Sequence, residues 1–383
     1  MKIKVNPGSL LGAMIALAGL FLPWVQGQIG LSLGQVDAAA WAWTPLLVLT
    51  VLATLGSLLR TRVVTVTLLV MGLGGALLTL LAFKSSLAAG YNDPALLDFW
   101  LVFFGKLLVA AGAVSYLGTL SGADRIAHVL RDFVPLISIP VFLFLFWEGV
   151  VEGLRVPMAF FPRVTDVVQV LTSAQGVLIE DSIHTFVRQV LLGYALGVST
   201  GLVVGLLVAF SPFLQRGLLP FATAFSAIPI VGLAPVLGRA FGVDWESKAA
   251  VVVIVSFFPM VINVVQGLTT VDPLEMDLMR SYAARRGQIL RKLRFPNALP
   301  YMFNALKIAS IIGLISVIVA EFLIPGPPEG LGQRISLSAR SGRYDVTFAA
   351  IAFASLLGIL FYNTIALLER FFTGWHSSFR EKQ

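Results

Sequence analysis

The chain has 383 residues, of which 57% are hydrophobic and 12% are charged, and its mean hydropathy is +0.90. Soluble domains carry about 25% charged residues, so this composition excludes a water-soluble globular protein. Cysteine is absent, which excludes disulfides, thiolate metal sites and cysteine nucleophiles; the net charge of +7 suits basic anchors of membrane helices, so no nucleic-acid partner is expected.

Apolar runs of about 17 to 25 residues, the length that a helix needs to cross about 30 Å of hydrocarbon, recur along nearly the whole chain. Backbone polar groups find no water in hydrocarbon, which favours helices as spanning elements. The sequence therefore predicts an all-α, polytopic membrane protein with about ten transmembrane helices. The expected spans lie near residues 9–25, 44–60, 63–83, 99–120, 133–151, 186–209, 218–238, 248–267, 302–323 and 346–369.

Basic residues are unevenly distributed between the loops on the two sides of these spans. An even number of spans places both termini on one side, and the segments on that side carry most of the arginines, among them Arg285, Arg286 and Arg291. Cytoplasmic loops are enriched in basic residues. We therefore expect a multi-pass protein of the cytoplasmic (inner) membrane with both termini in the cytoplasm.

A polar segment at residues 121–132 separates the first four expected spans from the last six. We take this segment as a cytoplasmic linker, because it lies on the basic side of the membrane. The expected organisation is an accessory four-helix membrane block at 1–120, the linker, a second block at 133–375 and a cytoplasmic tail at 376–383.

Lys106 stands almost alone as an ionisable residue within the spans of the first block. Its neighbours in this block include Gly72, Gly74 and Gly75, and small residues of this kind are typical of closely packed membrane helices. The lysine could line a path through the block. We favour a structural role, in which it pairs with Asp98 or snorkels to the membrane surface.

Two spans of the second block are rich in glycine and proline. In the span near 186–209, four glycines at four-residue spacing predict one smooth face along which a neighbouring helix packs closely. These glycines are Gly193, Gly197, Gly201 and Gly205. In the next span, Pro229 and Pro235 indicate a perturbed helix, and broken helices at membrane depth are tolerated where they line a cavity.

The basic segment at residues 269–300 lies between two apolar spans and contains the signals of a separate helix. Asp272 is a good N-cap, Pro273 suits the first helical position, and Glu275 completes a capping-box pattern. A short helix should therefore begin at Pro273. Its apolar residues recur at helical spacing and form a stripe that needs a partner outside the membrane: Leu274, Leu278, Met279 and Tyr282.

A second amphipathic turn follows this helix. Ile289, Leu290 and Leu293 alternate there with basic residues, and we expect Pro296 and Pro300 to end the turn. The segment could be an interfacial helix pair on anionic lipid, with its leucines in the headgroup layer. It could equally be a docking element that inserts apolar side chains into a groove of another protein.

The amino-acid sequence of this segment resembles the EAA loop of ABC importer permeases. The similarity runs from Asp277 to Pro300, with the acidic-Ala-Ala triplet of the family replaced by Asp277-Leu278-Met279 and its usual glycine by Ala283. The resemblance implies a coupling helix that seats in a cleft of a cytoplasmic ATPase. The implied coupling residues are Asp277, Leu278, Met279, Tyr282, Ala283, Ala284, Arg286, Pro296, Leu299 and Pro300.

Shorter stretches extend the resemblance over roughly Pro135 to Trp375. Ala227-Ile228-Pro229, Ala320-Glu321-Phe322 and Gly330-Leu331-Gly332 are similar to the nitrate/sulfonate/taurine branch of these permeases, and the coupling loop is most similar in wording to permeases for thiamine-precursor pyrimidines or riboflavin. The resemblance implies that residues 133–375 form a type I importer permease core of six helices. It also implies a small organic solute or anion of one of these kinds as the cargo.

The resemblance further implies the partners of such an importer. These are cytoplasmic ABC ATPase subunits, an extracytoplasmic solute-binding protein, and a second permease copy that makes a homodimer within the lipid bilayer. The sequence contains no G-x-x-x-x-G-K-[ST] loop, so ATP hydrolysis is expected on a separate chain and this chain is not expected to be an enzyme. No cofactor or metal is expected.

Side chains of the second block could line a translocation pathway whose two gates open alternately. The candidate pathway residues are Ser226, Pro229, Pro235, Asn263, Ser310 and Glu321. Glu321 could contact solute or brace a gate, or it could pair with Arg334 or Arg340 in the following loop. The alternative function is a proton-coupled secondary transporter, for which the spans offer chiefly Glu148 and Glu321 as proton carriers.

Overall fold

The computed structural model describes residues 6–20, 40–58, 61–88, 95, 97–119, 125–226, 228–324, 326 and 329–374. All regular structure within these ranges is helical, so the predicted all-α class is confirmed. The contacts between residues divide the chain into two compact units, Met1–Asp166 and Val167–Gln383.

Seven helices in the described ranges are long and apolar enough to cross a membrane, and the number is eight if the bent pair Pro212–Ser226 and Val231–Phe241 forms one span. Two shorter apolar helices, Pro7–Gly19 and Thr44–Ser57, coincide with the first two expected spans. The remainder of the first expected span, residues 21–25, lies outside the described residues. These helices together correspond one by one to the apolar runs of the sequence.

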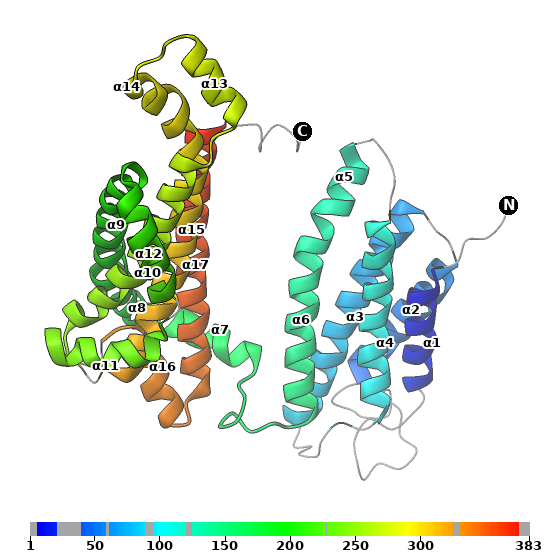
Figure 1. Cartoon of the computed structure of the whole chain (residues 1–383). Coiled ribbons are helices and arrows are strands. Elements are labelled where there is room, and N and C mark those ends of the chain that lie inside the picture. The colour runs from blue at the N-terminus through cyan, green and yellow to red at the C-terminus, as the bar shows by residue number, and fades with distance from the viewer. Residues whose placement is uncertain are drawn as a thin grey trace. The chain divides into compact units, whose positions relative to one another are not determined.

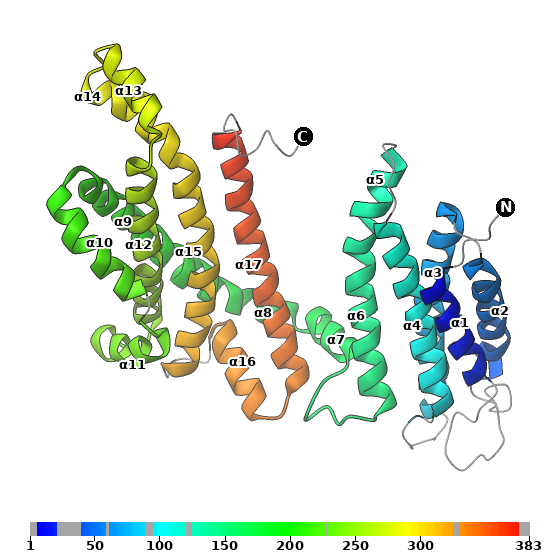
Figure 2. The same cartoon turned by 45° about the vertical axis from the view of Figure 1, so that its right-hand side comes forward.

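The first unit is a bundle in which α3 and α4 each pack against α6, α1 packs against α4, and α2 packs against α1 and α3 (Figures 1 and 2). Close backbone approach holds α1 to α4, since a Cβ added to Gly12 would lie 2.5 Å from the carbonyl oxygen of Gly105. Its helices are α1 (Pro7–Gly19), α2 (Ala40–Ser57), α3 (Arg62–Ala88), α4 (Leu97–Gly118), α5 (Arg125–Asp132) and α6 (Val134–Gly153).

Lys106 is fully buried in the middle of this bundle, so the expectation that it snorkels to the surface is wrong. Its ammonium group donates a 2.5 Å hydrogen bond to Oγ1 of Thr50 on α2. Gly75 on α3 makes room for the lysine, because a Cβ at Gly75 would lie 2.8 Å from Cδ of Lys106. The side chain of Asp98, the other expected partner, lies outside the described residues.

An ion pair joins α3 to α6 near the end of both helices. Nζ of Lys84 lies 2.5 Å from Oε1 of Glu148, which is buried and also accepts a 2.8 Å hydrogen bond from the Thr165 hydroxyl. Helix α6 therefore packs with α3 and α4 of the preceding block. That the permease core begins near residue 133 stays a prediction, because packing within one chain does not define the extent of that core.

The second unit contains the remaining helices, with the long helices α9, α12, α15 and α17 labelled in both views (Figures 1 and 2). α12 packs against both α9 and α15 and is the centre of the unit. The elements are α7 (Val164–Ser173, which begins in the first unit), α8 (Gln175–Ser182), the π-helical segment η2 (Ile183–Leu191), α9 (Leu192–Phe210), α10 (Pro212–Ser226), α11 (Ile230–Phe241), α12 (Trp245–Thr269), α13 (Pro273–Ser281), α14 (Arg286–Ile289), the π-helical segment η3 (Leu290–Arg294), α15 (Phe295–Leu323), α16 (Leu331–Arg340) and α17 (Tyr344–Thr373).

The glycine face predicted on α9 packs directly on α12. A Cβ at Gly193 or Gly197 would lie 2.5 Å from a backbone carbonyl oxygen of α12, that of Ala249 or Val253. Gly201 and Gly205 continue the contact and are buried as well. The predicted close packing is thus confirmed, and it permits the closest approach of two backbones in the second unit.

The expected span at residues 218–238 is broken, as its prolines indicated: the chain there forms two helices, α10 and α11, at an angle of 100°. Pro229 precedes α11 in an extended conformation, with φ −64° and ψ 121°. Proline lacks an N–H donor and disfavours helical geometry in the preceding residue, here Ile228, which accounts for a break at this point. Pro235, by contrast, lies inside α11.

Replacement of Gly197 by alanine should destabilise the second unit. The new Cβ would overlap the carbonyl oxygen of Val253, and overpacking of this kind costs about 1–3 kcal/mol. We expect Gly197→Ala to lower the unfolding temperature of the purified protein by several degrees in thermal unfolding followed by size-exclusion chromatography. Gly217→Ala on α10 is the matched control, since a Cβ there meets nothing within 4 Å, and equal shifts in the two variants would contradict the packing argument.

Candidate functional site

The segment between α12 and α15 contains the capped helix that the sequence predicts. Helix α13 begins at Pro273, and the carboxylate of Asp272 accepts a 2.8 Å hydrogen bond from the Leu274 N–H. The helix ends at Ser281, and Ala283 follows in the left-handed region with φ 50°. Glycine adopts this conformation without the steric penalty of a Cβ. This explains why EAA loops usually have a glycine at the position of Ala283.

One face of α13 is apolar and uncovered by any described residue. The exposed fractions are 78% for Leu274, 58% for Leu278 and 79% for Tyr282, whereas Met279 is half-buried. Apolar side chains so exposed on a short helix outside the spans mark an interaction surface. Asp277 stands beside this face and forms an exposed ion pair of 3.3 Å with Arg280.

The second half of the segment is anchored to the transmembrane helices. Asn297 donates hydrogen bonds to the carbonyl oxygens of Gly267 and Thr270, at 2.9 Å and 2.7 Å, and so ties the start of α15 to the end of α12. Leu299 packs into the core cluster of α9, α12 and α15 instead of facing outward. Movement of α13 is therefore mechanically connected to α12 and α15.

Pro296 and Pro300 do not end a helix, and that expectation is wrong. Pro296 occupies the first turn of α15, and Pro300 lies within the same helix, which continues to Leu323. Proline is tolerated in a first turn because the N–H that it lacks would have no intrahelical acceptor there.

We call residues 270–294, between α12 and α15, the coupling segment. Arg286 lies at a pocket of about 380 Å³ between this segment and the end of α9. Arg280 and Arg294 line the same pocket, together with Met276, Phe210 and Leu290. Three guanidinium groups around one hollow favour an anionic group of a partner. Ala284 is half-buried, and its N–H donates a 3.0 Å hydrogen bond to the carbonyl oxygen of Met279 at the end of α13.

A cavity of about 460 Å³ opens between α10, α11, α12 and α15. It brings together two of the predicted pathway residues, Ser226 and Asn263, and adds Ser316 of α15. Pro229 and Pro235 do not line it, although Ile228 and Leu233 beside them do. Ser310 is buried elsewhere and donates a 2.7 Å hydrogen bond to the carbonyl oxygen of Lys307.

Aromatic rings form the part of this cavity that the sequence reasoning missed. Phe225 and Phe258 both line it, with ring centroids 5.5 Å apart, and Phe221 stacks behind Phe225 at 4.3 Å. The helical spacing of Phe221 and Phe225 is the one signal that could have indicated them. None of the lining residues is ionisable, so the cavity offers ring faces, hydroxyls and one amide.

Glu321 lies outside this cavity and is fully buried at the far end of α15. Its carboxylate accepts hydrogen bonds from the Thr185 hydroxyl at 2.9 Å and from the Gly332 N–H at 2.6 Å. The expected ion pair with Arg334 or Arg340 is wrong, because Arg334 pairs with Asp181 at 2.7 Å.

The Gly330-Leu331-Gly332 motif closes around the Glu321 carboxylate. Gly330 has φ +109°, a conformation that favours glycine, and a Cβ there would clash with Oε1 of Glu321. A Cβ at Gly332 would lie 2.6 Å from Oε2. The N–H of Leu331 also donates to Thr185, at 2.8 Å, so one buried carboxylate fixes the start of α16 against α15 and η2.

Comparison with known proteins agrees with this arrangement. Residues 197–373 match the family described as "Binding-protein-dependent transport system inner membrane component". The chain is 33% identical over 194 residues to the formylaminopyrimidine transport permease protein ThiX of Halalkalibacterium halodurans, an alignment that covers 50% of this chain and 74% of ThiX. The riboflavin transport system permease protein RibX of Chloroflexus aurantiacus is 28% identical (67% of this chain, 96% of RibX), and the putative aliphatic sulfonates transport permease protein SsuC of Bacillus subtilis is 27% identical (67% of this chain, 91% of SsuC).

The chain therefore belongs to the family of inner-membrane permeases of binding-protein-dependent ABC transporters. It is a multi-pass inner-membrane protein, ATP hydrolysis belongs to the ABC ATPase, and the family implies that ATPase and a binding protein as partners. The matched residues include α13, the cavity and Glu321. About a third of this chain has no counterpart in RibX, since that alignment spans 67% of this chain and nearly all of RibX.

Loss of the Glu321 carboxylate should loosen the start of α16. Glu321→Ala leaves the buried Gly332 N–H and Thr185 hydroxyl without their acceptor, at a cost of about 1–3 kcal/mol, so hydrogen exchange at Gly332 and Leu331 should accelerate about tenfold or more. Glu321→Gln keeps one acceptor oxygen and should give a smaller effect. Glu329→Gln in the same loop is the control, because this side chain is 55% exposed; unchanged exchange in Glu321→Ala would contradict the anchoring role.

Proposed function

We propose that two copies of this chain enclose the translocation pathway of an ABC importer, and that α13 of each copy seats in an ATPase subunit. The observation that carries the proposal is the uncovered apolar face of Leu274, Leu278 and Tyr282 on a capped helix outside the spans. Nucleotide-driven movement of the ATPase would then displace α13 and, through the Asn297 anchor, α12 and α15. The cavity on these helices would open alternately to the two sides of the membrane.

The C-terminus would lie on the same side as the coupling segment. Lys307, three turns into α15, forms a 2.6 Å ion pair with Glu369, one turn before the end of α17. α15 leaves the coupling segment and α17 returns toward it, so these paired positions belong to one membrane face. With ten spans, as the sequence predicts, both termini would then lie in the cytoplasm, on the side of the ATPase.

The cavity favours a small uncharged, planar solute over a small anion. Phe225 and Phe258 offer ring faces for stacking, and Ser226, Asn263 and Ser316 offer hydrogen bonds. A nitrogen heterocycle uses both kinds of group, which agrees with the solutes named for the relatives ThiX and RibX. A sulfonate or nitrate would need a cationic partner, and none lines the described cavity.

The secondary-transporter alternative finds little support in the carboxylates. Glu148 is held in an ion pair with Lys84, and Glu321 is enclosed by Thr185 and Gly332, so neither lines the cavity as a proton carrier would. Membership in a family of binding-protein-dependent permeases favours ATP as the energy source.

A charge on the apolar face of α13 should prevent ATPase capture. Leu278→Asp would bury an unpaired carboxylate in the interface, at a cost of several kcal/mol, so the amount of co-expressed cognate ATPase that a tagged permease retains should fall at least about tenfold. The measurement is affinity purification followed by quantification of the two chains.

Leu278→Met is the matched control for this experiment. It keeps an apolar side chain of similar volume and should retain the ATPase, and Glu275→Gln should do the same on the polar side of the helix. Undiminished capture by Leu278→Asp would overturn the assignment of α13 as the coupling helix.

Access to the cavity should depend on the nucleotide state. The chain has no cysteine, so Ser226→Cys and Asn263→Cys introduce single reactive thiols into the cavity. With the ATPase and the binding protein present, we expect the rate of modification by a membrane-impermeant thiol reagent to change several-fold between the nucleotide-free and ATP-trapped complexes. A thiamine-precursor pyrimidine or riboflavin should slow the modification of Ser226→Cys, and taurine should not.

Ser199→Cys on the exposed side of α9 provides the comparison position. Its modification rate should be the same in both nucleotide states. Equal rates at Ser226→Cys in both states would contradict alternating access, and protection by taurine alone would overturn the proposed solute class.

A further inference from the structure

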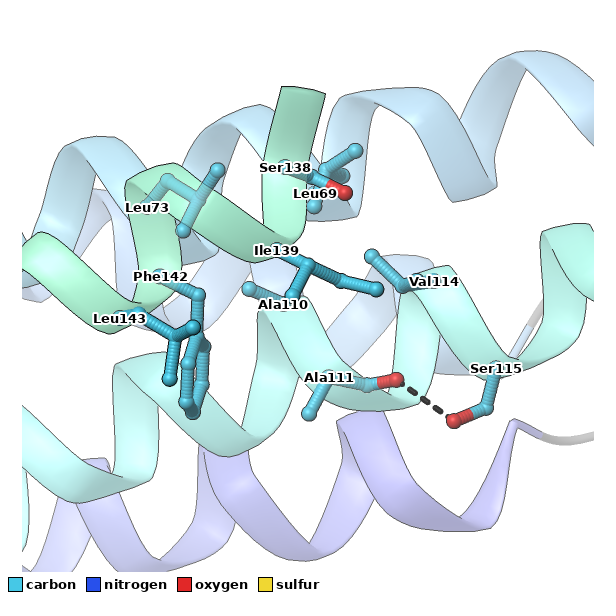
Figure 3. A pocket seen from close by; sticks show the side chains of 10 residues that line it. All are labelled: Leu69, Leu73, Ala110, Ala111, Val114, Ser115, Ser138, Ile139, Phe142 and Leu143. Atoms are coloured by element: carbon cyan, nitrogen blue, oxygen red, sulfur yellow. Dashed lines mark hydrogen bonds between the residues drawn. The ribbon is translucent and has the colours of Figure 1, made fainter. Parts of the chain in front are cut away.

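The first unit contains an open cavity of about 310 Å³ between α3, α4 and α6. Its lining residues all precede residues 197–373, the part of the chain that matches the permease family. Figure 3 shows its lining: Leu69 and Leu73 come from α3, Ala110 and Ala111 from α4, and Phe142 and Leu143 from α6. Nearly all of the lining is hydrocarbon. The small side chains of Ala110 and Ala111 leave the space that larger residues would fill.

One polar group in this cavity has no partner. Ser138 of α6 is 4% exposed, and its hydroxyl makes no hydrogen bond with any described residue. Ser115, the other serine of the lining, donates a 2.8 Å hydrogen bond to the carbonyl oxygen of Ala111 in its own helix, drawn as a dashed line in Figure 3. An unpaired buried hydroxyl is costly, so the Ser138 hydroxyl requires an acceptor that the described residues do not supply.

The two hydroxyls of the cavity lie near one end of the bundle, on the side of α5. Ser138 stands four residues after Val134, the first residue of α6, and Ser115 stands three before Gly118, the last residue of α4. At 1.5 Å per residue, both hydroxyls lie about 5–6 Å from the helix ends. Phospholipid ester carbonyls are hydrogen-bond acceptors at the boundary of the hydrocarbon core.

A basic amphipathic helix stands at the same end of the bundle. α5 immediately precedes α6, and its Leu130 packs against the cluster that contains Leu69 and Ala110 of the cavity lining. The side chains of His128 and Arg131 are 59% and 37% exposed, and both pair with the half-exposed carboxylate of Asp132, at 3.3 Å and 2.8 Å. A basic amphipathic helix at a membrane surface attracts anionic headgroups.

We propose that this cavity is a binding site for an anionic phospholipid. One acyl chain lies against Ala110 and Ala111 between α3 and α6, an ester carbonyl accepts the hydrogen bond of Ser138, and the headgroup phosphate meets Arg131 of α5. The three features occur in the order in which a phospholipid presents them, from hydrocarbon through ester to phosphate. The site is independent of the pathway and of the coupling helix.

Photolabelling of the full-length protein tests the site. The protein, in nanodiscs that contain phosphatidylglycerol with a diazirine in one acyl chain, should be labelled on peptides that include residues 110–115 and 138–143. Ala111→Phe fills the cavity and should reduce this labelling at least about fivefold. Ser138→Ala removes one hydrogen bond and should reduce it about threefold to tenfold.

Val70→Phe is the matched control, because it adds the same ring to α3 at a position that is 65% exposed and does not line the cavity. Its labelling should equal that of the unaltered protein, and size-exclusion chromatography should show that all variants remain folded. Unlabelled phosphatidylglycerol should compete at lower concentration than phosphatidylcholine. Equal labelling in Ala111→Phe and Val70→Phe, or equal competition by the two lipids, would each overturn the proposal.

Discussion

Helices in hydrocarbon gain almost nothing from the hydrophobic effect when they associate, because lipid tails are as apolar as leucine. The two units of this chain meet that constraint in the same way. Glycines bring backbones into direct contact, along α9 and α12 in the second unit and at Gly12 and Gly105 in the first. Buried polar anchors then select one arrangement: Lys106 with Thr50, Lys84 with Glu148, and Glu321 with Thr185.

The cavity and the segment between α12 and α15 share two helices, and this sharing would give the proposed transport mechanism its physical basis. α12 carries Asn263 in the cavity and ends beside Asn297, while α15 carries Ser316 and begins at the same anchor. Force applied at α13 therefore reaches the cavity through two rigid helices. A flexible loop in this position would dissipate such a movement.

Features that depend on near neighbours in the chain could be predicted from the sequence. The ten apolar runs and the capped start of α13 at Asp272 and Pro273 are of this kind, because run length and capping are local. The partners of Glu321 could not be predicted, since Thr185 lies 136 residues away and the nearer Arg334 was the plausible alternative. Pro229 indicated the break between α10 and α11, but the angle of 100° could not be predicted, because a proline does not specify the direction in which the chain continues.

The burial of Lys106 has a consequence for how the protein is made. A lysine at the centre of a helix is unfavourable in lipid by about 2.5–3.5 kcal/mol on the scale of translocon insertion. Its acceptor Thr50 on α2 and the recess at Gly75 on α3 both precede it in the chain, so both are synthesised before α4. When α4 is synthesised, the partners of Lys106 therefore already exist in the nascent chain. This order of synthesis allows the lysine to bind its acceptor without first facing lipid.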